Sequence, residues 1–186
     1  MKFSEMPYKR IDMDEVKKTY RDIIDRTKAA SSGEEQFEIH RAYYKFMDDV
    51  RTSMELAMIR HDNDTTDEFY EKESDFYDEV TPIISQYENE YGKVLYDSPY
   101  RDYLESKIGK VTFKNIEIAN KAFDEKIIPL MQEENALSSR YSKLIATAKI
   151  PFEGEVYNLS LMRKFQTSQD REVRRKAWKA VSDYFL

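Results

Sequence analysis

The chain contains no cysteine, and its glycines and prolines are few. The absence of thiols excludes disulfides, thiolate metal sites and a cysteine nucleophile, and it agrees with a reducing compartment, so we expect a cytoplasmic protein. Four glycines and five prolines must serve a chain of 186 residues. Because tight turns depend on these two residue types, the sequence predicts long helices with few connections.

Two further absences limit the partners. No stretch approaches the roughly 20 apolar residues of a membrane span, and residues 1–7 hold no apolar run typical of a signal peptide. The net charge is −6, which disfavours contacts with nucleic-acid phosphates. We therefore expect no nucleic acid and no membrane among the partners.

The sequence has enough hydrophobic residues to form a core and enough charged residues to cover it. Hydrophobic residues make up 40% and charged residues 35% of the sequence, with fourteen tyrosines and ten phenylalanines. That balance is typical of a folded helical protein and not of a disordered one. The aromatic residues should decide how the core packs.

Apolar residues recur at helical spacing through most of the chain. Residues 1–10 read as an extended arm, a capping box is expected at Ser32 and Glu35, and Pro82 should kink its helix or mark a boundary. Pro99 suits a first helical position, and Pro129 either breaks the pattern or starts the next helix. The predicted helices span about 12–30, 34–59, 69–94, 99–108, 113–123, 137–149, 158–165 and 170–186, with His61–Thr66 as a turn.

One segment departs from the helical pattern. Ile150–Tyr157 places two short apolar pieces on either side of Glu153-Gly154, which is typical of a β-hairpin. The predicted fold class is therefore all-α: a long-helix bundle with one small β-hairpin near 150–157.

The search for catalytic motifs returns none. His40 is followed by Arg41 and His61 by Asp62, so neither begins His-Glu-x-x-His, and neither has a glutamate three residues before it. Each histidine is interpreted as a surface or helix-end residue. The serines show no Gly-x-Ser-x-Gly turn. We assign no catalytic residue and no metal ligand.

The acidic segment Asp62–Asp67, with Glu73 at the twelfth place, faintly resembles a calcium loop. The sixth position of such a loop is glycine but here is Asp67. A polar helix start is the favoured interpretation, because acidic side chains suit the positive end of the helix dipole.

Three surfaces could bind partners. The aromatic stretch Phe69–Tyr103 could line a peptide groove, although core packing is the favoured interpretation. A basic run in the last helix could attract an acidic partner but fits a solvated helix face better. The apolar stripe of the same helix should be buried, and self-association of the chain through it is expected. The basic run is Arg171, Arg174, Arg175, Lys176 and Lys179; the stripe is Val173, Ala177, Trp178, Val181, Tyr184 and Phe185.

Six stretches of the sequence have a familiar pattern, and the most distinctive is Gln132–Leu144. The others are Met1–Tyr8, Ile59–Tyr70, Ile150–Glu155, Asn158–Ser160 and Asp170–Ala177. These stretches resemble the oligoendopeptidase F family, which is thimet-oligopeptidase-like, and the resemblance runs from end to end of the chain.

The resemblance implies a hydrolase, specifically a zinc metalloprotease that cleaves oligopeptides. Residues 1–186 would form a single N-terminal helical domain, truncated before the zinc-binding catalytic domain. This domain would be a scaffold that helps wall the substrate channel. The chain itself would hold no cofactor and would be inactive alone, with zinc in the full-length protein. Its partners would be oligopeptides and its own C-terminal catalytic domain. The resemblance assigns no substrate-binding residue. The alternative is a stand-alone helical protein-interaction module with no enzymatic role.

Overall fold

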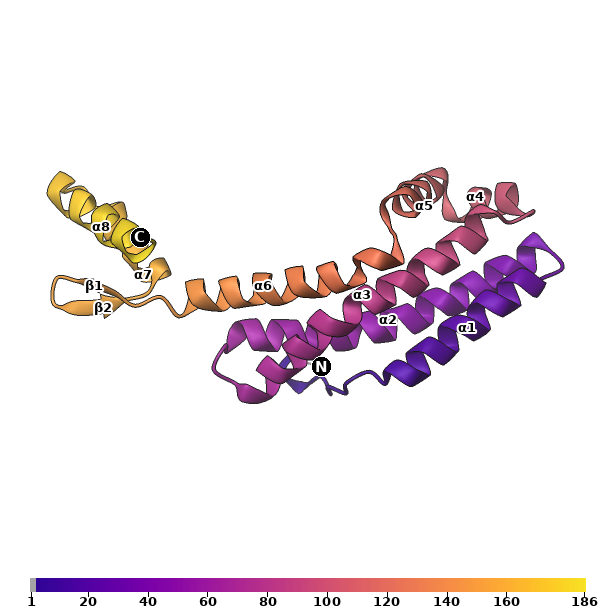
Figure 1. Cartoon of the computed structure of the whole chain (residues 1–186), viewed down its shortest axis with the longest axis horizontal. Helices are drawn as coiled ribbons and strands as arrows, with labels where there is room; N and C mark the ends of the chain where they lie inside the picture. Colours follow the sequence, from indigo (N-terminus) through magenta and orange to yellow (C-terminus); the bar gives the residue numbers. More distant parts are fainter. Residues whose placement is uncertain (1–2) are drawn as a thin grey trace. The chain divides into compact units, whose positions relative to one another are not determined.

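Three consecutive long helices pack along one another in the first part of the chain (Figure 1). They are α1 (Met13–Ala29), α2 (Gly33–Asn63) and α3 (Glu68–Tyr96). The computed structural model describes residues 3–186, apart from the side chain of Ser4. The all-α fold class with one small hairpin is confirmed.

Side-chain caps begin the long helices close to where the sequence places them. The Asp12 carboxylate accepts from the Asp14 amide at 2.9 Å, and Ser32 Oγ accepts from the Glu35 amide at 3.1 Å. The Glu35 carboxylate accepts from the amide of Ser31 at 2.8 Å, not from that of Ser32. The capping box is therefore present but reaches back one residue further than predicted.

Two expectations about α1–α3 are corrected. Helix α2 continues to Asn63, so His61 belongs to its last turn and the connecting turn is shorter than predicted. Residues 3–5 form a short 3₁₀ helix, η1 (Phe3–Glu5), and not an extended arm. Met1 and Lys2 lie outside the described residues.

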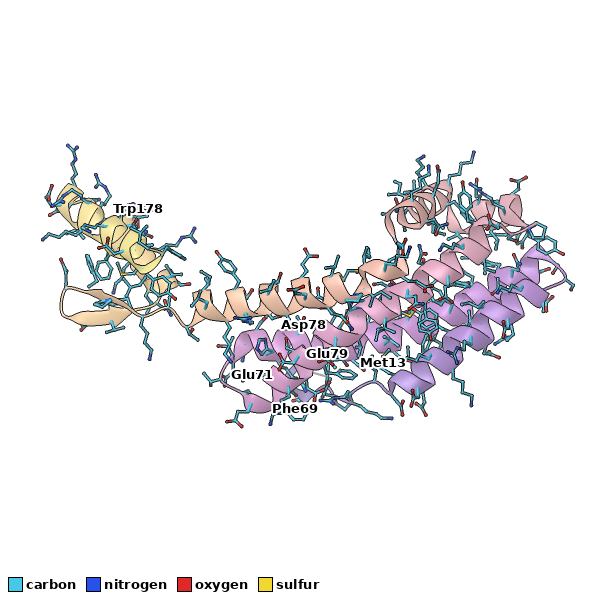
Figure 2. The ribbon with its side chains drawn as sticks, viewed as in Figure 1. Met13, Phe69, Glu71, Asp78, Glu79 and Trp178 are labelled. Atoms are coloured by element: carbon cyan, nitrogen blue, oxygen red, sulfur yellow. The ribbon has the colours of Figure 1, made fainter. Side chains whose placement is uncertain are left out.

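Helix α3 continues across Pro82, so this proline marks no boundary. Proline has no N–H to donate to the carbonyl four residues earlier, which belongs to Asp78. The Asn135 side chain donates to that carbonyl at 3.0 Å, and Gln132 donates to the Glu79 carbonyl at 2.7 Å. Asp78 and Glu79 lie on α3 where it runs beside α6 (Figure 2).

The connection after α3 folds into shorter elements, namely α4 (Arg101–Ile108), α5 (Lys110–Ala122), η2 (Glu125–Ile127) and α6 (Ile128–Ala146). Helix α4 begins at Arg101 and not at Pro99 as predicted. Gly109 ends it with φ of 100°, a conformation that favours glycine. Pro129 lies in the first turn of α6, where its missing N–H needs no partner, and so starts that helix.

The chain divides into two compact units, Met1–Asn135 and Ala136–Leu186. The first unit has a core built from α1–α5 in which tyrosines are prominent. Tyr20 stacks on Tyr87 with ring centroids 5.4 Å apart, and its hydroxyl lies 2.9 Å from the Met47 sulfur. The largest buried side chains include Tyr20, Tyr77, Tyr91, Phe113, Met47, Leu95 and Leu104.

The second unit contains the predicted hairpin. Strand β1 (Ile150–Phe152) pairs antiparallel with β2 (Glu155–Tyr157). Glu153 and Gly154 both have positive φ, 51° and 89°, as a two-residue hairpin turn with the right twist requires.

Two helices complete the second unit, α7 (Leu159–Gln166) and α8 (Arg171–Tyr184). Asn158 caps the first and Asp170 the second. Helix α8 ends at Tyr184, two residues before the predicted end. The core of this unit consists of Ile150, Phe152, Met162 and Ala177, with Val173, Val181 and Tyr184 packed against it.

Candidate functional site

The two histidines lie on one helix but far apart. His40 is near the start of α2 and His61 in its last turn, roughly 30 Å away along the helix at about 1.5 Å per residue. Among residues 3–186, no group of three or more His, Asp or Glu side chains is arranged to hold a metal ion. The described residues therefore supply no donor set that fits a zinc ion.

The interpretation of His40 as a surface residue is wrong. Its side chain is buried, with 4% of the residue exposed, and it stacks near Tyr43 and Tyr91. His40 Nδ1 lies 3.0 Å from the Tyr91 hydroxyl, within hydrogen-bonding distance. Burial lowers the pKa of His40 to about 4, so the imidazole is neutral at neutral pH. This is a core position and not a catalytic one.

Glu73 is the most deeply buried carboxylate of the described residues, and it holds the N-terminal segment. Its carboxylate accepts from Arg10 Nε at 2.9 Å and also from the Tyr8 hydroxyl. The hydrogen-bonded Arg10 guanidinium lowers the pKa of Glu73. Glu73 therefore faces Arg10 and not the Asp62–Asp67 segment, where Asp62 and Asn63 are helical. The geometry agrees with the polar helix-start interpretation.

The aromatic stretch Phe69–Tyr103 contributes mainly to the core. Tyr77 and Tyr91 are 2% exposed and pack inside the first unit. Phe69 is exposed, and it makes edge contacts with Tyr8 and Tyr70. The core interpretation is confirmed for the two buried tyrosines.

The basic run of α8 is engaged locally. Arg174 donates to the carbonyls of Ser168 and Gln169 at 2.6 and 2.8 Å. Arg175 pairs with Glu172 at 2.8 Å, and Lys179 with Asp183 at 2.8 Å. These exposed pairs fit the solvated helix face that the sequence favours.

A cavity of about 430 Å³ lies in the first unit between α3, α5 and the start of α6. Residues at helical spacing on α3 and α5 form two of its walls, and Ile127 of η2 and Met131 of α6 also line it. Its volume falls within the roughly 300–1,000 Å³ of small-molecule sites. The lining comprises Ser85, Glu88, Asn89, Gly92, Ile116, Ala119, Asn120, Ala122, Phe123, Ile127 and Met131.

Sequence reasoning missed this cavity. Ser85, Asn89 and Gly92 are small or polar residues spaced by four and three on α3. That spacing could have indicated a polar face opposite α5. The sequence could not show that this face of α3 meets Ile116 and Asn120 of α5, because which helices pack together is decided only in the folded protein.

The second unit exposes several large apolar side chains. Trp178 is 60% exposed, and Phe185, just past α8, is 54% exposed. Figure 2 shows Trp178 on α8. The other members of the predicted stripe pack on the hairpin and α7, so burial is confirmed for them and wrong for these two. Leu137, Tyr141 and Leu144 of α6 are also exposed.

The long helices and the single hairpin define an all-α chain with one small two-stranded sheet. Comparison with known proteins identifies the family to which the chain belongs. Residues 3–123 match the family model described as the Peptidase M3 N-terminal domain, and the chain belongs to this family. No match was found among curated proteins.

Solved structures agree over the whole chain. PZ peptidase A, determined with an inhibitor, is 39% identical over 99% of this chain with a TM-score of 0.95. An oligoendopeptidase F is 38% identical over 100% with a TM-score of 0.96. Another oligoendopeptidase F, from Bacillus anthracis str. Ames, is 34% identical over 100% with a TM-score of 0.95. The resemblance read from the sequence is confirmed.

The chain spans about a third of the length of these structures, between 33% and 34% of each. It corresponds to a peptidase N-terminal part. Within the described residues, no helix has both the length and the apolar character needed to cross a bilayer.

Proposed function

We propose that this chain is the N-terminal scaffold and substrate-channel part of a zinc-dependent metalloendopeptidase that hydrolyses oligopeptides. In this proposal, residues 1–186 are followed by a catalytic domain that carries the zinc. The observation that carries the proposal is the end-to-end structural match to two oligoendopeptidases F and a PZ peptidase, each about three times longer than this chain.

In the proposed enzyme, the zinc ligands belong to the catalytic domain because the two histidines of this chain are far apart. His40 is buried beside Tyr91 and His61 lies at the far end of the same helix, so the two cannot share a metal ion. A hydrolytic zinc site usually needs three protein ligands and an open position. In the proposed enzyme these ligands come from the catalytic domain. Zinc there would activate water for attack on the peptide bond, with a glutamate of that domain as base.

The exposed apolar side chains of the second unit support a partner domain. Trp178, Phe185 and Tyr141 are each more than half exposed. Burying a large apolar side chain stabilises a protein by roughly 1.5–3 kcal/mol, so a covering domain would gain from these contacts. We propose that the catalytic domain of the same protein covers part of this surface.

The coding sequence after Leu186 gives the first test. We expect it to encode a His-Glu-x-x-His box with a further glutamate downstream, and the encoded longer protein should hydrolyse a quenched-fluorescent oligopeptide. A chelator should abolish that hydrolysis and added zinc should restore it. A stop codon directly after Leu186, or a longer protein without chelator-sensitive hydrolysis, would instead favour the interaction module.

A further inference from the structure

We propose that the cavity between α3 and α5 binds the amino-terminal residue of a peptide, with its apolar side chain inside and its α-ammonium group near Asn89 and Glu88. That the ligand is a peptide rests on the proposed function. The site itself rests on the walls of the cavity, all of which belong to the first unit.

The walls suit an apolar group. Ile116, Phe123, Ile127 and Met131 supply most of the large side chains that line the cavity. Gly92 adds no side chain, and a Cβ there would lie 3.3 Å from Ile116 Cγ2. The open volume of about 430 Å³ therefore adjoins closely packed helix backbones. An aliphatic or aromatic side chain would be removed from water on entering it.

Asn89 supplies a hydrogen-bond acceptor that the protein does not use. The residue is 7% exposed, and its Nδ2 donates to Asn120 Oδ1 at 3.1 Å. Its Oδ1 is buried and finds no hydrogen-bond partner in the described part of the chain. A buried carbonyl oxygen without a donor destabilises the protein. A ligand that brings an N–H group to this oxygen would remove that destabilisation.

The charge of the cavity selects a cation. Glu88 is the one charged residue in the lining, and no lysine or arginine belongs to it. The Glu88 carboxylate is held from the α2 side by Arg51 at 3.1 Å. An anionic group would find no cationic side chain in the lining, whereas an ammonium group could share the Glu88 carboxylate with Arg51.

One ligand type combines these three properties. The first residue of a peptide carries an apolar side chain, a free ammonium donor and a following amide N–H within a few bonds. A peptidase that held this end at a fixed place would select how far along the peptide cleavage falls. Small apolar amines also combine an apolar group with an ammonium donor, and the experiment distinguishes them from peptides.

The test is a titration of the ¹⁵N-labelled chain followed by NMR. The probe is the dipeptide amide Leu-Gly-NH₂, compared with its N-acetyl form and with isopentylamine, which keeps the leucine side chain and the amine but lacks the peptide. We expect saturable shifts of the Asn89 and Asn120 side-chain amides and of the Gly92 amide. N-acetylation should weaken binding by about tenfold or more, since it removes a charged donor.

Variants locate the site. Ala119→Trp places bulk in the lining and should abolish the shifts, whereas Ala42→Trp, on the exposed surface of α2, should leave binding unchanged. Asn89→Leu keeps the side-chain size but removes the acceptor. It should weaken the binding of Leu-Gly-NH₂ by about tenfold. It keeps the test decisive if Ala119→Trp fails to fold.

Four results would overturn the proposal: no saturable shift, equal binding of the N-acetyl form, equal binding by Ala119→Trp, or isopentylamine binding as tightly as the dipeptide amide. Failure of the proposed function is a separate outcome. It would appear as a longer protein without chelator-sensitive hydrolysis, and this binding experiment needs neither zinc nor turnover.

Discussion

Single buried polar side chains fix how the helices of the first unit meet. Glu73 reaches from α3 to Arg10 and Tyr8, and Arg60 donates to the Met6 carbonyl at 2.6 Å. Hydrogen bonds of Tyr8, Arg10 and the Met6 carbonyl therefore tie the segment before α1 to Glu73 of α3 and Arg60 of α2. Such partly buried contacts are stronger than fully exposed pairs because water competes less for them.

Glu73→Gln should destabilise the chain by about 2 kcal/mol, since it removes the charge that pairs with Arg10 while leaving the site buried. Asp75→Asn, on the exposed face of the same helix, is the matched control and should stay within about 0.5 kcal/mol of the parent. Urea unfolding followed by circular dichroism gives both values. Equal effects of the two substitutions would contradict the assigned role of Glu73.

His40 should make stability depend on pH. Its folded-state pKa of about 4 lies below the unfolded value of about 6.5, so the unfolded chain binds the proton first. The contribution is fully present above about pH 6.5 and is lost as the pH falls toward 4. Between about pH 7.5 and 5 the loss should be about 2 kcal/mol.

His40→Leu should remove this part of the pH dependence, because leucine does not titrate. Burial raises the pKa values of the neighbouring Tyr43 and Tyr91, so they stay neutral in this range. The lowered pKa of Glu73 places its titration below this window. A variant with the same slope as the parent protein between pH 7.5 and 5 would show that His40 is not the group responsible.

Among the helices, α3 and α6 show how one element compensates for another. Pro82 takes an amide donor from the middle of α3, and Asn135 and Gln132 of α6 donate to the carbonyls nearby. The proline thus leaves a carbonyl acceptor on α3 that binds a side chain of α6. In the interior of an isolated helix, a proline would destabilise the helix by about 3 kcal/mol.

Asn135→Leu should destabilise the chain by about 1–3 kcal/mol, because the Asp78 carbonyl loses its side-chain donor. In a Pro82→Ala background the backbone amide of residue 82 can take that role, so the same substitution should cost less. A double-mutant cycle measured by urea unfolding gives the difference, expected to be about 1 kcal/mol. Additive effects of the two substitutions would contradict the proposed compensation.

Local signals in the sequence predicted most elements but not their lengths or their neighbours. The helix starts near residues 12, 158 and 170 and the Glu153-Gly154 turn were predicted, because capping by Asp12, Asn158 and Asp170 and the turn itself each act within a few residues. The extension of α2 past Ile59 and the continuity at Pro82 depend on distant contacts. The cavity was missed for the same reason, since Asn89 and Asn120 meet only after α3 and α5 pack.

Viewed as a whole, the chain is a peptidase N-terminal part with its large apolar side chains unevenly distributed. Four tyrosines lie in the core of the first unit, while the second unit leaves Trp178, Phe185, Tyr141 and Leu144 exposed. Large apolar side chains left exposed are candidates for contact with a partner. In the proposed enzyme they meet the catalytic domain.

Without that domain, we predict that the chain associates with itself through the exposed surface of α8. Trp178→Ala combined with Phe185→Ala should weaken the association, since each aromatic contributes roughly 1.5–3 kcal/mol when fully buried. Analytical ultracentrifugation of both forms provides the measurement, with Phe69→Ala, exposed in the first unit, as control. A parent chain that stays monomeric at high concentration would contradict the prediction.

The most direct test of the central claim is hydrolysis of a quenched-fluorescent oligopeptide by this chain alone, with zinc in excess and contaminating proteases removed. The claim is that residues 1–186 act as scaffold and not as catalyst, because neither histidine lies within a metal-binding group of the described residues. We expect no turnover above the rate without protein. Zinc-dependent turnover that co-purifies with the chain and survives protease removal would contradict the account.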